Sequence, residues 1–249
     1  MPKTPDAIVL CGGAGLRLKT ITGDLPKSMA NIVDRPFLEL LLMQLRRYRF
    51  RRVILAVGYR EDLIRSYFGA RAFGLRLTYS AESSPLGTGG ALRHASDLIE
   101  SESVLIMNGD SYTDADLTEF VIDYRESNAD ASVIVVPPDG RADCGMVVVD
   151  GNGKVGGFEE KRFPSQASYV NAGIYLIAKR ILRDIPPGNQ ISLERELFPQ
   201  WLREGRHVRA FVCAQKCVDI GTPDRYMNAQ GILATVEKNK NLPQERRDI

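Results

Sequence analysis

A regular alternation of short apolar, β-branched runs with helical patterns is the feature that most constrains the fold of this chain. Runs of this kind that end in turn residues are typical of buried strands. The clearest predicted strands are Ala7–Cys11, Val53–Val57, Val104–Asn108, Ser132–Val136, Met146–Asp150, Gly173–Ile177 and Val208–Cys213. Apolar residues at helical spacing predict helices at Pro36–Tyr48, Glu61–Phe68, Thr88–Glu100 and Thr118–Ser127. Up to about residue 136 this alternation predicts an α/β fold with βαβ units, a parallel sheet and right-handed crossovers.

The pattern changes after Pro137 and Pro138. The sequence Asp150-Gly151-Asn152-Gly153 lies between two apolar runs and predicts a hairpin turn. Further helices are expected at Ile191–Arg203 and Pro223–Val236, and the charged segment 237–249 is expected to be a mobile tail. Because the chain has no internal repeat and no flexible linker, we expect a single domain over residues 1–236. Its two halves would be residues 1–136 and a strand-rich part at 137–236.

Composition narrows the classes of function. The 249 residues carry a net charge of only +2, so no global basic field favours nucleic acid or an anionic membrane. The four cysteines are few and irregularly spaced, which favours reduced thiols over a disulfide scaffold or a metal cluster. The sequence shows neither a signal-peptide pattern nor an apolar run long enough to span a bilayer, so we expect a cytoplasmic protein. Homo-oligomer formation is left open.

A glycine-rich loop directly follows the first predicted strand, with Gly12, Gly13 and Gly15 in close succession. Glycines at such a place let backbone N–H groups approach an anion without interference from Cβ atoms. The loop lacks the Gly-Lys-Ser/Thr ending of a Walker A motif. A dinucleotide fingerprint would need glycine where Leu18 stands and an acidic residue after the second strand, and both are missing. Alone, the loop is equally consistent with a tight turn.

Two cations sharpen the interpretation of this loop. Arg17 lies inside it, and Lys27 follows Pro26 a short distance along the chain. A triphosphate is well served by a planar guanidinium for its terminal oxygens and a point charge at the reacting phosphorus. Either residue taken alone would be interpreted as a solvated surface cation.

The glycine run at residues 12–18, followed by Pro26-Lys27, resembles the signature of the sugar-phosphate nucleotidyltransferase family. The match continues in order through residues 82–91, 108–110, 159–161, 171–173 and 219–223 and covers nearly the whole chain to about Tyr226. The six blocks in order are more specific than any one of them. The chain departs from the family pattern at Leu16, usually Thr, and at Ser28, often a second Pro, and neither change removes a charge.

This resemblance implies a Rossmann-like, mostly parallel sheet flanked by helices, with a strand-rich sugar-binding lid in the second half. It also implies a role for each block. The catalytic residues would be Arg17 and Lys27. Nucleotide binding would fall to Leu10, Gly12, Gly13, Gly15, Glu82, Gly87 and Thr88, and sugar phosphate binding to Gly145, Glu160, Lys161 and Asn171. Asp110 and Asp219 would hold Mg²⁺.

Structural interpretations compete for several of these residues. Asp110 follows a predicted strand, where ligands of open parallel sheets gather and where Mg²⁺ finds carboxylates, but Asp is also common in turns and caps. Asp219 alone would be interpreted as a helix cap. If the family resemblance is set aside, Thr88 is predicted to be the N-cap of the following helix. Glu160 and Lys161 alone would be ordinary surface charges.

The activity implied by the resemblance is transfer of a nucleoside monophosphate to a sugar 1-phosphate with release of pyrophosphate. The attacking phosphate is already anionic, so positioning and charge stabilisation suffice without a general base. The compact length and the Pro-Leu-Gly-Thr-Gly-Gly-Ala block most resemble heptose and short mannose 1-phosphate guanylyltransferases. GTP and D-glycero-D-manno-heptose 1-phosphate are therefore the expected substrates.

Other functions are kept open. Within the class, mannose or glucose 1-phosphate with GTP, UTP or dTTP is the alternative. A non-catalytic regulatory subunit that binds nucleotide-sugars would be expected to lose a cation or a metal carboxylate, whereas Arg17, Lys27, Asp110 and Asp219 are all present. A nicotinamide oxidoreductase is disfavoured by Leu18 and the missing acidic residue.

Overall fold

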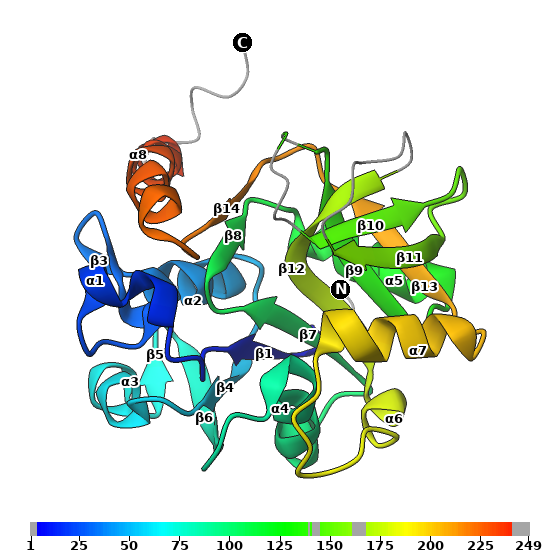
Figure 1. The fold of residues 1–249 in the computed structure, drawn as a ribbon, viewed down its shortest axis with the longest axis horizontal. Helices are drawn as coiled ribbons and strands as arrows, with labels where there is room; N and C mark the ends of the chain where they lie inside the picture. Colours follow the sequence, from blue (N-terminus) through cyan, green and yellow to red (C-terminus); the bar gives the residue numbers. More distant parts are fainter. Residues whose placement is uncertain (1–3, 139, 141–144, 161–167, 241–249) are drawn as a thin grey trace.

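The computed structural model describes residues 4–138, 140, 145–160 and 168–240 (Figure 1). Its centre is a ten-stranded mixed sheet with the main order β11-β10-β12-β7-β1-β4-β6-β5, and β9 and β13 continue from β12. The most central strand of the first half, β1 (Asp6–Leu10), pairs in parallel with β4 (Arg52–Val57) and with β7 (Ser103–Asn108). The predicted parallel βαβ arrangement is therefore confirmed for these strands.

One strand of the parallel part was missed in the sequence. β6 (Leu75–Ala81) pairs in parallel with β4, and the short β5 (Arg71–Ala72) pairs with it in antiparallel fashion. The alternating burial of β6, with polar residues between apolar ones, reflects its place near the edge of the sheet. A continuous apolar run, the signal used for the other strands, is absent from it.

The second half adds antiparallel strands, which corrects the expectation of a parallel sheet as far as residue 136. The long strand β12 (Ser168–Ala178) lies between β7 and β9 (Ala131–Val136) and is antiparallel to both. Its apolar side chains are buried along most of its length, which suits a strand covered on both faces. β13 (Val208–Val212) then pairs in parallel with β9.

The predicted hairpin turn after Val149 is confirmed. β10 (Gly145–Val149) and β11 (Val155–Glu160) are antiparallel neighbours. The Asp150 carboxylate accepts hydrogen bonds from the backbone N–H groups of Asn152 and Lys154, at 2.9 Å each. The side chain thus holds the turn from within, as Asp does in turns of this kind.

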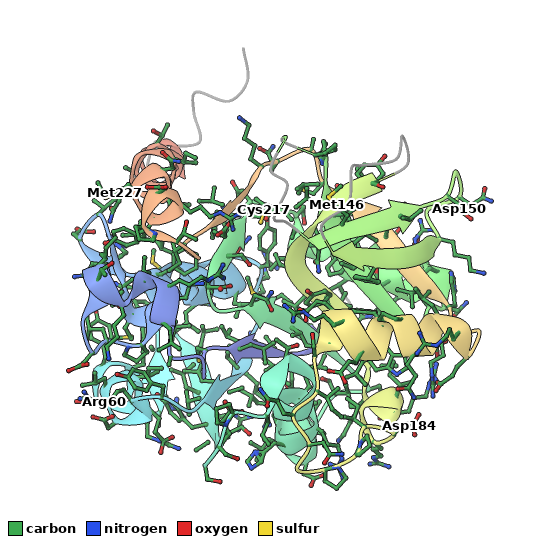
Figure 2. All side chains as sticks on the ribbon, viewed as in Figure 1. Arg60, Met146, Asp150, Asp184, Cys217 and Met227 are labelled. Atoms are coloured by element: carbon green, nitrogen blue, oxygen red, sulfur yellow. The ribbon has the colours of Figure 1, made fainter. Side chains whose placement is uncertain are left out.

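Helices cover both faces of the sheet, and each face has its own apolar core. On one face pack α2 (Phe37–Arg47), α3 (Glu61–Phe68), α5 (Leu117–Ser127) and α8 (Pro223–Lys240). On the other pack α4 (Gly87–Ala95), α6 (Lys179–Leu182), the π-helical turn η4 (Leu193–Leu197) and α7 (Phe198–Arg203). Figure 1 shows α2 and α8 on the opposite side of β1 from α4, and Figure 2 shows the side chains that fill both layers. None of the helices in the described ranges offers an apolar stretch that would span a bilayer.

Several helix boundaries differ from the expectations; among them, the helix expected to reach Glu100 ends at Ala95 and is followed by a 3-10 turn at Ser96–Leu98. α4 begins at Gly87, its preceding residue is Leu86, and no side chain caps it, so the prediction of Thr88 as the N-cap is wrong. The helix expected at Ile191–Arg203 is a π-helical turn followed by α7. The Leu197 N–H donates to the Ser192 carbonyl five residues earlier at 3.1 Å, and the Ser192 hydroxyl caps the turn by accepting from the Arg195 N–H. α8 runs on to Lys240, four residues further than expected, and residues 241–249 of the predicted tail lie outside the described ranges.

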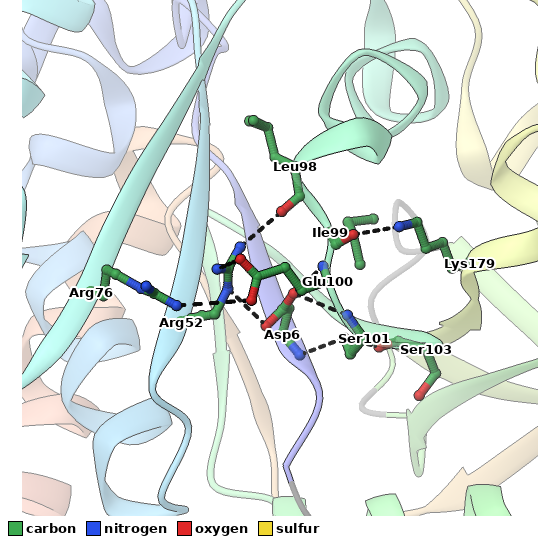
Figure 3. A network of polar contacts seen from close by, with 9 residues as sticks. All are labelled: Asp6, Arg52, Arg76, Leu98, Ile99, Glu100, Ser101, Ser103 and Lys179. Atoms are coloured by element: carbon green, nitrogen blue, oxygen red, sulfur yellow. Dashed lines mark hydrogen bonds and ion pairs between the residues drawn. The ribbon is translucent and has the colours of Figure 1, made fainter.

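A polar cluster ties the strands together at their amino ends (Figure 3). Asp6 Oδ2 accepts hydrogen bonds from the N–H groups of Glu100 and Ser101, at 2.6 and 3.3 Å. Its other oxygen pairs with Arg52 Nε at 3.2 Å, and Arg52 also pairs with Glu100 and donates to the Leu98 carbonyl. The cluster therefore joins β1, β4 and the segment before β7 through one nearly buried carboxylate.

Replacing Asp6 with Ala should destabilise the fold, because it leaves the Arg52 guanidinium and two N–H groups without their shared acceptor. Breaking a buried ion pair from one side typically costs about 3 kcal/mol. Urea unfolding should show this loss for Asp6→Ala. The control is Asp34→Ala, which breaks an exposed pair with Arg35 and should stay within about 0.5 kcal/mol of the parent chain. Equal stability of the two variants would show that the Asp6 cluster does not hold the strands.

Candidate active site

A cavity of about 600 Å³ opens at the carboxyl ends of β1, β4, β6 and β7. Its walls are the loops that follow these strands and the first turn of α4, which is the usual place for a ligand in an open α/β sheet. The residues singled out from the sequence that line it are Leu10, Gly12, Gly13, Lys27, Glu82, Gly87, Thr88 and Asp110. The structure thus brings the predicted nucleotide-binding segments together.

Close packing explains two glycines of the first loop. A Cβ atom on Gly12 would lie 2.8 Å from Glu82 Oε1 and 3.3 Å from the backbone nitrogen of Gly58. Gly15 has a φ of +61°, and a Cβ atom there would lie 2.6 Å from Lys27 Cβ. The loop is therefore pressed between Glu82 on one side and the stem of Lys27 on the other, where only glycine fits.

Lys27 connects this loop to the end of β7. The turn η2 (Lys27–Met29) carries it, and its side chain is only 13% exposed. Its Nζ atom lies 2.5 Å from Asp110 Oδ2. A Cβ atom built on Gly221 would lie 3.6 Å from the same Nζ atom and 3.0 Å from Asp219 Oδ1. The ammonium group therefore pairs with one of the two carboxylates that the sequence assigned to a metal, and the Gly221 backbone lies near both the ammonium group and the other carboxylate.

Asp219 reaches this position through a small separate sheet. β14 (Cys217–Asp219) is antiparallel to β8 (Ser111–Thr113), with Asp219 opposite Ser111. The Ile220 N–H donates to the Asp110 carbonyl at 3.0 Å. Asp219 Oδ1 accepts hydrogen bonds from the Gly221 N–H and from Arg225 Nη1, at 3.0 Å each. The pairing of β14 with β8 therefore makes two segments far apart in the chain neighbours.

The donor set around Lys27 suits Mg²⁺. Oxygen ligands are what Mg²⁺ prefers, and it commonly takes one or two protein carboxylates together with phosphate oxygens and water. Asp110 and Asp219 supply two carboxylates, and the position of the Lys27 ammonium shows that the surroundings accept a cation. Across the described ranges no group of three or more His, Cys, Asp or Glu side chains gathers, so a cage made of protein ligands alone does not fit.

Glu82 forms the opposite wall of the cavity, at the end of β6. Its Oε2 atom accepts a hydrogen bond from the Leu86 N–H at 3.2 Å, and Oε1 faces Gly12. Burial raises the pKa of this carboxyl group, while the Leu86 N–H and the charge of His94 oppose the rise. A partly desolvated acceptor in a cavity wall is suited to N–H donors of a ligand.

The first turn of α4 is held by the segment before η4. Gly87 has a φ of +70°, and a Cβ atom on it would lie 2.6 Å from the Ile191 carbonyl oxygen. That oxygen accepts hydrogen bonds from the N–H groups of Gly89 and Gly90, at 2.8 and 3.3 Å. Thr88 Oγ1 donates to Glu194 Oε2 at 2.9 Å and accepts from the Leu193 N–H at 2.7 Å. The Thr88 hydroxyl therefore contacts η4 and does not cap its own helix.

The predicted sugar-binding residues are only partly visible. Gly145 lies opposite Glu160 in the β10–β11 pair, and Lys161 falls outside the described residues. Asn171, on β12, donates from Nδ2 to the Tyr175 hydroxyl and accepts from the Gly173 N–H, at 2.9 Å each. Gly145 and Asn171 do not line the cavity formed by the described residues, and neither do Gly15, Asp219 or the exposed Arg17 on η1 (Leu16–Leu18).

Comparison with known proteins decides the family. The family model described as "Nucleotidyl transferase" matches residues 6–235. The chain belongs to this family. A D-glycero-alpha-D-manno-heptose 1-phosphate guanylyltransferase of Campylobacter jejuni is 37% identical over 88% of this chain and 96% of its own length. A mannose-1-phosphate guanylyltransferase of Mycobacterium tuberculosis is 32% identical over 92% of this chain and 64% of its own length.

Solved structures agree with this assignment and with the expected fold class. HddC from Yersinia pseudotuberculosis superposes with a TM-score of 0.81 at 31% identity, covering 92% of this nucleotidyltransferase and 100% of that chain. A second structure of HddC, in complex with GMP-PN, gives a TM-score of 0.80 at 30% identity.

Several cavity residues of this nucleotidyltransferase were not singled out from the sequence. Tyr59 and Gln190 line the cavity from loops without a recognisable motif. Gly109 is required by packing, since a Cβ atom there would lie 2.5 Å from the Leu10 carbonyl oxygen. The Asn-Gly-Asp block at the end of β7 had indicated in the sequence that this glycine clears space, but not that the Leu10 carbonyl is its neighbour.

The pKa of Glu82 predicts an unusual pH dependence of stability. Because its pKa is raised above the ordinary 4.5, the folded nucleotidyltransferase keeps a proton there that the unfolded chain has already lost. The contribution of Glu82 to the stability of the fold therefore decreases as pH rises from the unfolded-state pKa through the higher folded-state pKa. The Tm of Glu82→Gln, taken relative to the parent chain, should rise between about pH 4 and about pH 7.

Glu204→Gln is the control of opposite sign. Hydrogen bonds from Gln200 and Arg206 lower the pKa of Glu204, so its contribution is present above the unfolded pKa and is lost as pH falls. The relative Tm of this variant should fall as pH rises. Thermal unfolding followed at several pH values measures both differences, and parallel trends for the two variants would contradict the prediction.

Proposed function

We propose that this nucleotidyltransferase transfers GMP from GTP to D-glycero-D-manno-heptose 1-phosphate and releases pyrophosphate. The observation that carries the proposal is the meeting of the glycine loop, Lys27 and Asp110 in one cavity, with the Lys27 ammonium 2.5 Å from the carboxylate. A triphosphate in this cavity would meet backbone N–H groups, a nearly buried cation and a metal-binding carboxylate. These are the groups that stabilise phosphoryl charge when a nucleotide is transferred.

Each group of residues has its own proposed role in binding or catalysis. The N–H groups of the glycine loop receive the phosphates, and Lys27 faces the α-phosphate from the turn behind the loop. Asp110 and Asp219 would hold Mg²⁺, which supplies charge neutralisation of the phosphate oxygens when bound. Arg17 is exposed on η1 beyond the loop, where a long guanidinium side chain can reach the leaving pyrophosphate. The sugar phosphate oxygen attacks the α-phosphorus in line, and no proton has to be removed from it.

The choice of substrates rests on the cavity and on the relatives. Glu82 offers a desolvated carboxyl oxygen, which suits the adjacent N–H donors of guanine. The Campylobacter jejuni relative, which is named for guanylyl transfer to the heptose 1-phosphate, covers 88% of this chain. Gly145, Glu160, Lys161 and Asn171 are proposed to bind the sugar phosphate. The mannose 1-phosphate guanylyltransferase relative supports mannose 1-phosphate as the second candidate.

A matrix of nucleoside triphosphates against sugar 1-phosphates, read out as pyrophosphate release, tests the proposal. GTP with D-glycero-D-manno-heptose 1-phosphate should give the highest kcat/KM, and omission of Mg²⁺ should abolish turnover. A higher kcat/KM with mannose 1-phosphate would identify the second candidate. Binding of nucleotide-sugar without pyrophosphate release from any pair would instead identify a regulatory subunit.

Lys27 and Arg17 should differ in the kinetic constant that they affect. Lys27 is held against the site of reaction, so Lys27→Met should lower kcat by about 10²-fold, as for other groups that stabilise charge in the transition state. Arg17 is proposed to hold the pyrophosphate portion throughout, so Arg17→Met should chiefly raise KM for the triphosphate. Steady-state kinetics with each substrate varied separately measures the two effects. A near-normal kcat for Lys27→Met would assign the α-phosphate to another group.

A further inference from the structure

A carboxylate outside the cavity gathers three hydroxyl groups. Glu194 lies on η4 and is not among the residues that line the cavity. Its Oε1 atom accepts from the Tyr175 hydroxyl at 2.9 Å. Its Oε2 atom accepts from Thr88 Oγ1 at 2.9 Å and from Ser192 Oγ at 3.2 Å. Thr88 lines the nucleotide side of the cavity, whereas Tyr175 belongs to β12.

The neighbouring groups fix the direction of these hydrogen bonds. Thr88 Oγ1 already accepts from the Leu193 N–H at 2.7 Å, so its proton points to Glu194. The Tyr175 oxygen accepts from Asn171 Nδ2 at 2.9 Å, so the phenol proton also points to Glu194. Tyr175 is fully buried, and burial raises its pKa well above the ordinary value, which keeps the phenol protonated. The Thr88 and Tyr175 hydroxyls therefore both donate to the Glu194 carboxyl group.

The result is a continuous chain of hydrogen bonds between the two proposed half-sites. It begins at Thr88 in the first turn of α4 (the nucleotide turn), passes through Glu194 and Tyr175, and ends at Asn171. Both ends of this series of hydrogen bonds are fixed to the backbone, because the Leu193 N–H donates to Thr88 and the Gly173 N–H donates to Asn171. In a buried environment such bonds strengthen one another, and an unpaired member is costly.

The turn η4 also links these hydrogen bonds to the first turn of α4. Turns with π-helical geometry are rare and frequently occur at functional sites. The Ile191 carbonyl just before η4 holds the first turn of α4, so a shift of η4 reaches the nucleotide turn through the backbone as well.

We propose that the chain Thr88–Glu194–Tyr175–Asn171 couples the two substrate sites, with Glu194 and Tyr175 as positioning residues. The proposal rests on the proposed function. A triphosphate that orders Thr88 orders Asn171 in advance, so the sugar 1-phosphate then binds with a smaller ordering cost. By linkage, the sugar 1-phosphate tightens triphosphate binding by the same factor.

Calorimetry with a GTP analogue whose α–β bridging oxygen is replaced by carbon, so that pyrophosphate cannot leave, tests the coupling without turnover. Its Kd is measured alone and with saturating D-glycero-D-manno-heptose 1-phosphate, or with the sugar 1-phosphate that the substrate matrix selects. We expect the second ligand to tighten binding by about fivefold or more in the parent chain. Tyr175→Phe and Glu194→Gln should bring this factor close to one while the Kd of the analogue alone changes much less. The double variant should behave like either single variant, since both break the same chain.

Tyr124→Phe is the matched control, because it removes the hydroxyl of a buried tyrosine on α5 that takes no part in the Thr88–Glu194–Tyr175–Asn171 hydrogen bonds. This variant should keep the full coupling factor. Tyr175→Phe retains the ring in the core, so it serves if Glu194→Gln does not fold. The proposal is overturned if both variants keep the full coupling factor, or if the parent protein itself has a factor close to one. Either result leaves the proposed function intact. Absence of pyrophosphate release from every substrate pair would overturn the proposed function itself.

Discussion

The parallel pairing of β1 with both β4 and β7 is the constraint on which the rest of the structure depends. It places the carboxyl ends of three strands side by side, so the loops that follow them share one cavity. The same pairing brings the amino ends together at the opposite edge, where the Asp6 carboxylate joins the strands (Figure 3). A nearly buried polar cluster thus lies at one end of the strands and the cavity at the other.

At the carboxyl ends of the strands, three glycines permit close contacts that a Cβ atom would block. Gly12 lies against Glu82, Gly15 against Lys27, and Gly109 against the Leu10 carbonyl. These contacts leave room for an anion and bring a nearly buried ammonium to a carboxylate. Because both charges are partly desolvated, their interaction is stronger than that of an exposed pair. A site arranged in this way stabilises phosphoryl charge by positioning, which is what nucleotidyl transfer requires.

The second half of the chain approaches the cavity from the other side of β7. β12 is inserted between β7 and β9, and it carries Asn171 and Tyr175 toward η4. β14 approaches separately and brings Asp219 to Asp110. The two halves of the chain therefore meet through hydrogen bonds as well as through the apolar cores.

The sequence by itself determined the elements whose signals are local. Apolar runs, helical spacing and turn residues identified most of the strands and helices, and α3 has the predicted ends, Glu61 and Phe68. The glycine loop and the other blocks indicated the family by resemblance, because six blocks in the family's order are specific even where each block alone is not. The alternating strand β6 escaped this reasoning, since its edge position makes its pattern weak.

Tertiary structure alone decided which distant segments meet. The position of β12 beside β7, the approach of Asp219 to Asp110 and the contact of Thr88 with Glu194 all join residues far apart in the chain. A local pattern states that a strand or a turn will form, but it does not name the partner. The partner is selected by burial of both faces of the sheet and by pairing of every buried polar group, which are properties of the folded chain as a whole.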